Sequence, residues 1–351
     1  MKLARIFAFG SLLALTSCGG SEPAKTDEPP PPPAEPTVLK VPTGIEDMLV
    51  PPDNPITPEK VELGKMLFFD KRLAKDGKMS CETCHLPEKG WTDAKAISTR
   101  ADGKPNTRHS PTLYNVGFQD SWYWDGRAAT LEAQIKAAWN GQMATDPMAQ
   151  EAVAMKLNGI DGYKTAFQSA MGGEATPDRI VQALATFVRT LRAENTPWDK
   201  YEKGDKTAVT DEVRAGFEVF RATECGLCHT PPLYTDKGFH NIGIGMTNAT
   251  PDLGRGKILA DKQDPSAESM NGAFKTPTLR AVAESGPYFH DGSGKTLEQA
   301  VDVLLKGGID NPHKDAKLKA REISGPEKKA LISWLKALSP EPVKFERPKL
   351  P

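Results

Sequence analysis

The sequence carries the pattern Cys-x-x-Cys-His twice, over residues 81–85 and again over residues 225–229. This pattern is typical of c-type haem attachment, in which each Cys forms a thioether with the haem and the His binds the iron. A zinc site or a redox dithiol is the alternative, but a Cys2His2 zinc site uses a distant His pair and a redox dithiol needs no trailing His. We therefore expect two covalently bound haem c groups. Their attachment and iron-binding residues would be Cys81, Cys84, His85, Cys225, Cys228 and His229.

Each motif follows a segment that predicts an amphipathic helix, and this helix would position the motif. In residues 213–220, apolar side chains recur at i, i+4 and i+7, which is one face of a helix. Residues 61–68 have a related sequence ahead of the first motif. Thr57 and Thr210 are suited to cap the two helices at their N-termini.

The similarity between the two halves continues downstream and predicts the architecture. Pro-Thr-Leu occurs at residues 111–113 and 277–279, and Thr-Leu-Glu occurs at residues 130–132 and 296–298. Each half also ends in an amphipathic pattern, which in the second half starts with the capping-box pattern at residues 324–327. The sequence thus predicts a mostly α fold of two cytochrome c-like domains related by internal duplication. We place these domains at residues 51–204 and 205–345.

The N-terminal residues predict export and a lipid anchor. Lys2 and Arg5 precede an apolar stretch that ends in Leu-Thr-Ser-Cys, which resembles a bacterial lipoprotein signal. Residues 1–17 would be the signal peptide and Cys18 would carry the lipid; in the alternative, an ordinary signal peptide, Cys18 has no role. Residues 18–50 contain an unbroken proline run and predict a Pro-rich tether. We therefore expect a periplasmic lipoprotein that is anchored to a membrane.

The composition narrows the range of partners. The chain has 351 residues, with 45 Lys and Arg against 46 Asp and Glu, so its net charge is −1. This balance lacks the basic field on which generic nucleic-acid binding depends, and no nucleic-acid partner is expected. The length suits two domains, and no internal apolar run is long enough to span a bilayer.

With these motifs in view, the chain resembles the bacterial di-haem cytochrome c peroxidase family, which includes the di-haem enzyme that matures tryptophan tryptophylquinone. The resemblance covers roughly residues 50–345 and rests on both haem motifs and on further segments. These segments are Leu63–Asp70, Ser110–Thr112, Trp124–Ala129, Phe274–Arg280 and Pro287–Gly292.

The resemblance implies different roles for the two halves. The N-terminal haem would react with hydrogen peroxide, and the C-terminal haem would accept electrons from a small cytochrome or cupredoxin. Trp124 matches the tryptophan proposed to help electrons cross between the irons, and a buried structural role for it stays open. Arg127 would bind a haem propionate or form an ordinary salt bridge. A homodimer also stays open.

The distal side of the first haem departs from the family pattern. The usual distal His falls near Ala101, so no His stands at that position. The only His of this loop is His109, directly before Ser110, where many relatives have an Asn that helps bind a calcium ion between the domains. His109 therefore has a structural, a haem-linked or a metal-related role, and an interdomain calcium ion is one option. The simplest expectation is an open or water-filled sixth site on the first haem.

The proton-transfer group of the family is also missing. Peroxide cleavage needs a group that moves a proton between the two oxygens, and relatives use a Glu in the stretch that matches residues 137–146. No Glu occurs there, and Gln142 is the best match. Its amide could orient peroxide but could not transfer a proton, so Asp146 and Glu151 are considered as substitutes. We predict Gln142 and Trp124 as the catalytic residues.

The second haem departs from the family in its sixth ligand. Leu304 stands where relatives have Met or Tyr, and Leu cannot bind iron. His240 and His290 lie in stretches that are ordinary for the family and are expected near the haem rather than on its iron. The remaining candidate ligands of this half are Met246, Met270 and His313.

Two functions of different classes follow from these patterns. The first is a di-haem peroxidase that reduces hydrogen peroxide, with a close variant that oxidises a protein side chain. The second is an electron-transfer lipoprotein without a substrate pocket. An open first haem favours the enzyme, whereas the missing Glu favours the electron carrier.

Overall fold

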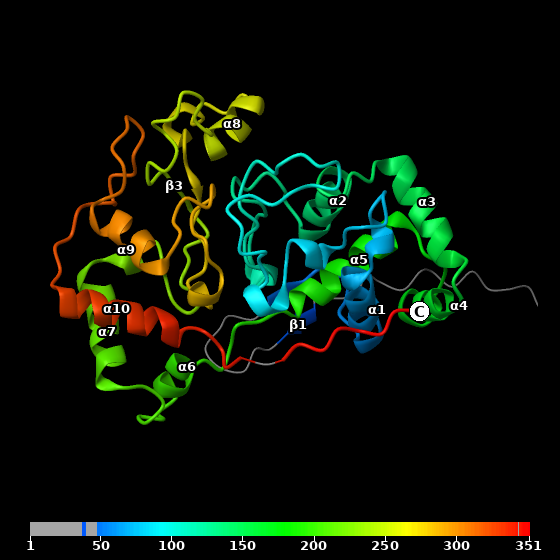
Figure 1. The fold of residues 1–351 in the computed structure, drawn as a ribbon, viewed down its shortest axis with the longest axis horizontal. Helices are drawn as coiled ribbons and strands as arrows, with labels where there is room; N and C mark the ends of the chain where they lie inside the picture. The colour runs from blue at the N-terminus through cyan, green and yellow to red at the C-terminus, as the bar shows by residue number, and fades with distance from the viewer. Residues whose placement is uncertain (1–36, 40–47, 343) are drawn as a thin grey trace, which may run out of the picture. The chain divides into compact units, whose positions relative to one another are not determined.

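Helices dominate the part of the chain that the structure describes (Figure 1). The structure is a computed structural model and describes residues 37–39, 48–342 and 344–351. Two pairs of short antiparallel strands accompany the helices: β1 (Thr37–Leu39) with β2 (Met48–Val50), and β3 (Phe239–His240) with β4 (Phe274–Lys275). The predicted mostly α fold is confirmed. The described α-helices are α1 (Pro58–Phe69), α2 (Leu131–Gly141), α3 (Pro147–Asn158), α4 (Asp161–Met171), α5 (Pro177–Arg189), α6 (Pro197–Glu202), α7 (Asp211–Ala222), α8 (Gly254–Asp261), α9 (Leu297–Leu305) and α10 (Gly325–Ala337).

The N-terminal predictions fall largely outside the described residues. This holds for the signal peptide at residues 1–17, for Cys18 and for most of the tether. The last residues of the predicted tether differ from expectation, because Met48 and Val50 are buried in a small hydrophobic cluster with Phe118 and Leu233. None of the described helices combines the length and the apolar character that crossing a membrane requires.

The first half is built around the contact between α1 and α5. Gly64 of α1 lies so close to α5 that a Cβ at this position would overlap the Ala183 carbonyl. This close approach allows Leu63 and Leu67 to be fully buried in the core of this half. As predicted, the Thr57 side chain caps α1 and accepts a hydrogen bond from an N–H of its first turn at 3.2 Å.

The second half is built around the contact between α7 and α10. Gly216 of α7 lies against α10, where a Cβ would overlap the Ala330 carbonyl. The predicted caps are confirmed: Thr210 accepts from the Val213 N–H at 3.4 Å, and residues 324–327 form a capping box at the start of α10. The Trp334 side chain of α10 is fully buried in this core.

Two segments pack with the half that their position in the sequence does not suggest. Trp198 of α6 lies in the second core, with its ring 4.7 Å from that of Phe217, whereas the predicted boundary at residue 204 assigns α6 to the N-terminal domain. Phe345, which follows α10, packs against the first core. Both placements depend on long-range apolar contacts that short sequence patterns do not encode.

The two halves are joined by hydrogen bonds between their loops. Arg108 of the first half forms ion pairs with Asp125 at 2.6 Å and with Asp252 of the second half at 2.7 Å. The His109 N–H donates to the carbonyl of His290 at 2.7 Å. The loop that precedes Ser110 therefore lies against the second half.

Candidate functional site

Each half contains a cavity that is lined by one Cys-x-x-Cys-His motif. The first cavity, of about 240 Å³, is lined by the two Cys and the His of residues 81–85. The second, of about 250 Å³, is lined by those of residues 225–229. Both motifs begin in a single 3-10 turn. Trp124 and residues 275–277 line both cavities and so lie between them.

The imidazole of His85 is held by a backbone carbonyl. Its Nδ1 donates a hydrogen bond to the carbonyl of Trp91 at 2.8 Å. Burial lowers the pKa of His85, so the ring is neutral at pH 7. A neutral ring whose Nδ1 donates has its free lone pair on Nε2, which is the arrangement of a metal-binding His.

His229 has the same arrangement in the second half. Its Nδ1 donates to the carbonyl of Tyr234 at 2.9 Å, and burial lowers the pKa of this His as well. The two residues whose carbonyls accept these bonds share an uncommon backbone conformation, with φ of +61° at Trp91 and +53° at Tyr234. Each ligand candidate is therefore oriented by an aromatic residue that follows it closely in the chain.

The cysteines of both motifs are unpaired thiols. Burial raises the pKa of Cys81 to about 12 and also raises the pKa of Cys84 and of Cys225. These thiols are protonated at neutral pH, unlike the activated thiolate of a redox dithiol. Two thiols and one neutral His on the wall of a cavity are a donor set that fits haem c and does not favour the redox dithiol.

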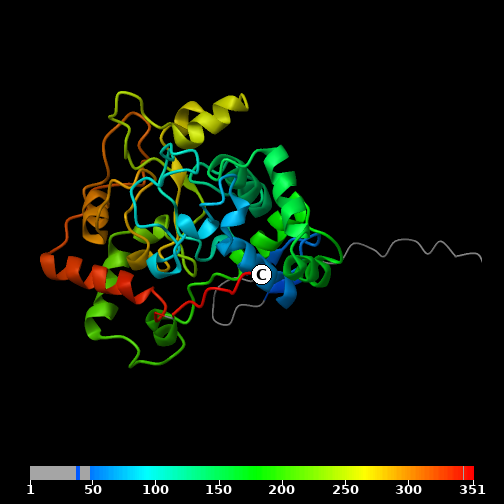
Figure 2. The same ribbon diagram turned by 45° about the vertical axis from the view of Figure 1, so that its right-hand side comes forward.

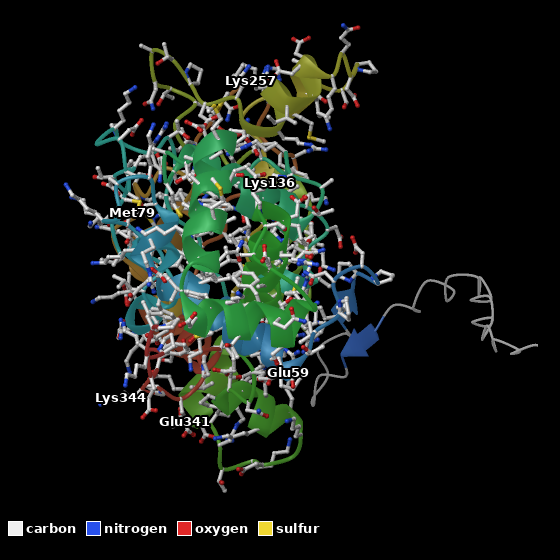
Figure 3. All side chains as sticks on the ribbon, turned by 90° about the vertical axis from the view of Figure 1, so that its right-hand side faces the viewer. Glu59, Met79, Lys136, Lys257, Glu341 and Lys344 are labelled. Atoms are coloured by element: carbon white, nitrogen blue, oxygen red, sulfur yellow. The ribbon has the colours of Figure 1, made fainter. Side chains whose placement is uncertain are left out.

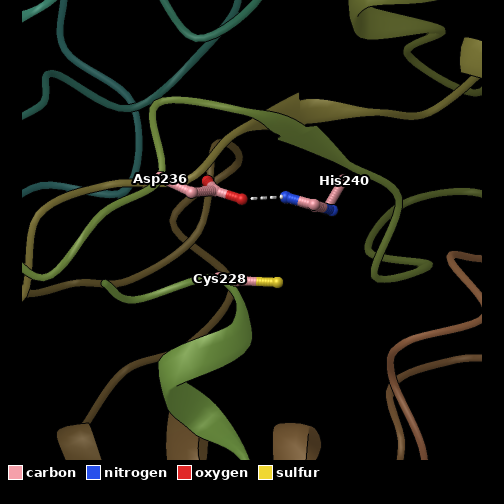
Figure 4. Close-up of side chains that lie close together, drawn as sticks. All are labelled: Cys228, Asp236 and His240. Atoms are coloured by element: carbon pink, nitrogen blue, oxygen red, sulfur yellow. Dashed lines mark hydrogen bonds and ion pairs between the residues drawn. The ribbon is translucent and has the colours of Figure 1, made fainter.

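His240 lies beside the second motif, close to Cys228 and Asp236 (Figure 4). Its Nδ1 donates to Asp315 at 2.5 Å and its Nε2 donates to Asp236 at 2.8 Å. The Cys228 sulfur and the two carboxylates raise the pKa of His240 to about 10. Because both ring nitrogens are engaged, His240 is a charged neighbour of the motif and not an iron ligand.

Trp124 and Arg127 come from the same tight loop. The Trp124 indole N–H donates to the carbonyl of His109 at 2.9 Å, and the Trp124 carbonyl accepts from the Lys275 N–H at 2.8 Å. Arg127 lines the first cavity but also pairs with Asp125 at 2.8 Å and covers the Tyr123 ring at 3.5 Å. The salt-bridge alternative for Arg127 is therefore present in the structure.

Gln142 lies on the wall of the first cavity and is bonded to the loop that contains Ala101. The side-chain carbonyl oxygen of Gln142 is buried without a hydrogen-bond partner among the described residues. The Gln142 backbone carbonyl accepts from the Ala101 N–H at 2.9 Å. Asp146 caps α3 and Glu151 is exposed on that helix, and neither lines the cavity. No Asp or Glu of the described chain lines this cavity.

His109 is buried at the wall of the first cavity. Its Nδ1 donates to the Lys95 carbonyl at 2.8 Å, whereas its Nε2 is buried and finds no partner in the described part of the chain. Burial lowers the pKa of this ring, so Nε2 is an acceptor at neutral pH. This combination favours the haem-linked role over a purely structural one.

The second cavity contains Leu304 on its wall, as well as His240 and His290. The His290 ring stacks on Phe274 with 3.6 Å between the ring centres. The three remaining ligand candidates do not line this cavity: these are Met246, Met270 and His313.

Several residues of the site were not singled out from the sequence. Trp91 and Tyr234 could have been noticed, because each is an aromatic residue shortly after a haem motif. Gln134 lines the first cavity one helical turn inside α2. Lys275 lines both cavities, and its ammonium group donates a hydrogen bond to the Ser121 carbonyl. Burial lowers the pKa of Lys275 to about 8.

Comparison with known proteins identifies the family. A model of the di-haem cytochrome c peroxidase family matches residues 58–207. The methylamine utilization protein MauG of Methylorubrum extorquens is 36% identical over 346 residues, which cover 97% of this chain and 95% of that protein. The cytochrome c551 peroxidase of Nitrosomonas europaea is 33% identical over 309 residues, 86% of each chain.

A solved structure supports the same assignment. A MauG-like protein associated with microbial copper homeostasis superposes with a TM-score of 0.73 at 27% identity, covering 86% of this chain and 95% of that one. Sequence identity at this level over nearly the whole of several relatives means that the chain belongs to the di-haem cytochrome c peroxidase family, whose members carry covalently bound haem c.

Proposed function

We propose that the protein is a di-haem peroxidase-type oxidoreductase with one haem c in each cavity. The first haem would be held by Cys81, Cys84 and His85, and the second by the equivalent residues of the motif at 225–229. The observation that carries this proposal is the same donor set in both cavities: two unpaired thiols and a neutral His whose Nδ1 is fixed by a carbonyl. When bound, haem supplies an iron that coordinates peroxide and exchanges electrons.

The substrate that this site supports best is hydrogen peroxide, reduced in the N-terminal half. The reaction takes up two electrons and two protons and releases two waters. The electrons would come from a small cytochrome or cupredoxin that meets the C-terminal half. Leu227 supports this entry point, because it lies inside the second motif and 52% of its surface is exposed. Leu227 also lines the second cavity, so a donor that contacts it would lie next to the proposed second haem.

The residues of the first cavity would orient peroxide and supply its protons. Gln142 offers a buried carbonyl oxygen without a partner, which can accept a hydrogen bond from a peroxide O–H. His109 offers a neutral Nε2 on the same wall and is the chemically suited proton acceptor. Trp124 lines both cavities and would carry electrons between the halves.

A second function is favoured by the absence of any described carboxylate on the wall of the first cavity. If His109 does not move the proton between the peroxide oxygens, no carboxylic acid of the described cavity wall can replace it, and turnover of peroxide alone would be slow. Oxidation of a side chain on another protein then becomes the competing activity, while a non-catalytic electron carrier is the third option.

Spectra of the isolated protein with one equivalent of peroxide distinguish these functions. We expect high-spin bands that shift on addition of peroxide and return when a reduced donor is added. Two low-spin haems that ignore peroxide would identify an electron carrier. In the double variant Cys81→Ala, Cys84→Ala, a pyridine haemochrome assay should find one haem per chain, and finding two would refute the assignment.

The remaining proposals concern origin and location. We propose that the halves, at residues 51–204 and 205–345 in the sequence, arose by duplication; the equivalent contacts of Gly64 and Gly216 with their partner helices support this.

We also propose that the protein is a periplasmic lipoprotein anchored to a membrane at Cys18. In the source bacterium, Cys18→Ser should release the protein from the membrane fraction, and a wild type that is already released would contradict the anchor.

A further inference from the structure

The C-terminal segment at residues 344–351, here called the strap, lies on the first half of the molecule. In Figures 1 and 2 the red end of the chain leaves α10 and runs alongside α1. Phe345 stacks on Phe69 of α1 with ring centres 5.4 Å apart and meets Trp91 edge-on at 5.1 Å. Arg72 donates to the Pro351 carbonyl at 3.0 Å, so the strap is held at both ends.

Arg347 of the strap bonds to residues on both sides of His85. It forms an ion pair with Glu82, which lies inside the first Cys-x-x-Cys-His motif. Its guanidinium also makes two hydrogen bonds to Glu88, at 2.6 and 3.0 Å. These bonds hold the pKa of Glu88 below its usual value. One side chain from the far end of the sequence thus connects the motif to the turn that follows it.

Phe345 contacts the residue that orients His85. Trp91 has φ of +61°, a conformation that a bulky side chain rarely adopts, and its carbonyl accepts the Nδ1 hydrogen bond of His85. Such a conformation persists only where packing holds the side chain. The Trp91 ring is held by Phe68, by Phe187 and by Phe345 of the strap.

The second half achieves the same geometry without a strap. Tyr234 also has a positive φ, and its carbonyl accepts from His229. Its ring packs on Phe220 at 6.1 Å and on Trp334 at 5.4 Å, both from helices of its own half. The strap therefore supports one of the two histidines only.

We infer that the strap is a positioning device for His85, in which Phe345 and Arg347 hold the Trp91 loop so that its carbonyl fixes the His85 ring. This inference rests on the proposed binding of haem at His85. A strong Nδ1 hydrogen bond raises the basicity of the ligating imidazole, which favours the oxidised iron. Loss of the strap is therefore expected to weaken that bond and to affect the first haem without affecting the second.

The test compares Phe345→Ala and Arg347→Ala with the wild type, using the full-length di-haem protein. Spectroelectrochemistry should show an upward shift in the midpoint potential of the first haem, with the second unchanged. Resonance Raman of the reduced protein should show a lower iron–histidine stretching frequency for the first haem alone. Phe345→Leu keeps an apolar side chain and Arg347→Lys keeps the charge, so each should restore much of the wild-type value.

Lys344→Ala is the matched control, because Lys344 is exposed at the start of the strap and no described residue pairs with it (Figure 3). It should leave both haems unchanged. Equal shifts of both haems in Phe345→Ala and Arg347→Ala, or no shift of the first, would overturn the role of the strap. A wild-type protein with no haem at the first motif would instead overturn the proposed function itself.

Discussion

His109 is the residue that would decide whether the sixth coordination site of the proposed first haem is open. The ring is fixed by its Nδ1 hydrogen bond to the Lys95 carbonyl, and its Nε2 is a buried acceptor at the wall of the first cavity. Ala101, at the usual distal His position, contributes a backbone bond to Gln142 and no ligand. The first cavity therefore has one imidazole besides that of His85, and whether it binds iron decides how the site is opened.

We expect the first haem to bind cyanide in the fully oxidised protein, without prior reduction. The physical reason is that the distal loop supplies no His at Ala101, so a ligand meets an open site. Titration of the oxidised wild type and of His109→Ala with cyanide checks this. Fast binding in both proteins supports the open site, whereas binding in the variant alone would show that His109 occupies it.

Gln142→Glu should raise the rate of peroxide reduction. In the proposed mechanism the amide would orient peroxide but could not transfer a proton, whereas a carboxylic acid at the same place could. General acid–base catalysis contributes about 10²–10⁴-fold, so we expect an increase of about 10²-fold in kcat/KM for peroxide. Gln142→Met removes the amide without adding an acid and is the control. An unchanged rate in Gln142→Glu would mean that proton transfer already proceeds by another group.

The helix pairs that carry the two motifs depend on one glycine each. In Gly64→Ala and Gly216→Ala the added methyl would overlap a carbonyl of the facing helix. We expect each variant to lose about 1–3 kcal/mol of unfolding free energy, the usual cost of overpacking. Gly141→Ala is the control, because Gly141 ends α2 with open space around it and Ala favours helix. Denaturant unfolding measures all three, and an undiminished stability of Gly64→Ala would contradict the close contact.

The starts of the helices could be predicted from the sequence where their capping signals are local. The caps at Thr57 and Thr210 and the capping box at residues 324–327 depend on side chains within one turn of the helix start, and all three are confirmed. The packing of α6 and of Phe345 was not predictable, because each joins a core whose other members lie far away in the sequence.

The features of the site, too, could be predicted from the sequence only where they depend on short local patterns. The Cys-x-x-Cys-His motifs are short patterns, and the structure gives each motif a cavity of its own. The carbonyl bonds from Trp91 and Tyr234 depend on positive φ angles that packing sustains, and single-residue propensities do not reveal them. The isolation of Asp146 from the first cavity follows from its use as the cap of α3.

Arg108 connects the two halves through ion pairs, which are called the charged link below. This side chain is largely buried and bonds to Asp125 and to Asp252, one from each half. Burial favours the neutral form of Asp252, but the hydrogen bonds from Arg108 outweigh this and hold its pKa below the usual value. The proposed transfer of electrons across Trp124 would require the halves to stay in this arrangement, so the link would serve function as well as stability.

Asp252→Asn should weaken this link in a way that depends on pH. A carboxylate with a lowered pKa adds stability above its ordinary pKa near 4, and that stability is lost as the pH falls through the folded-state value. At pH 7 we expect the variant to be less stable by about 1 kcal/mol, allowing for solvent screening, and the difference should disappear once the pH is low enough to protonate Asp252 in the folded protein. Thermal unfolding across this range measures it. Asp261→Asn, which removes an exposed pair with Lys257 on α8, should stay close to the wild type throughout. A constant difference between Asp252→Asn and the wild type at all pH values would mean that the Asp252 charge does not hold the halves together.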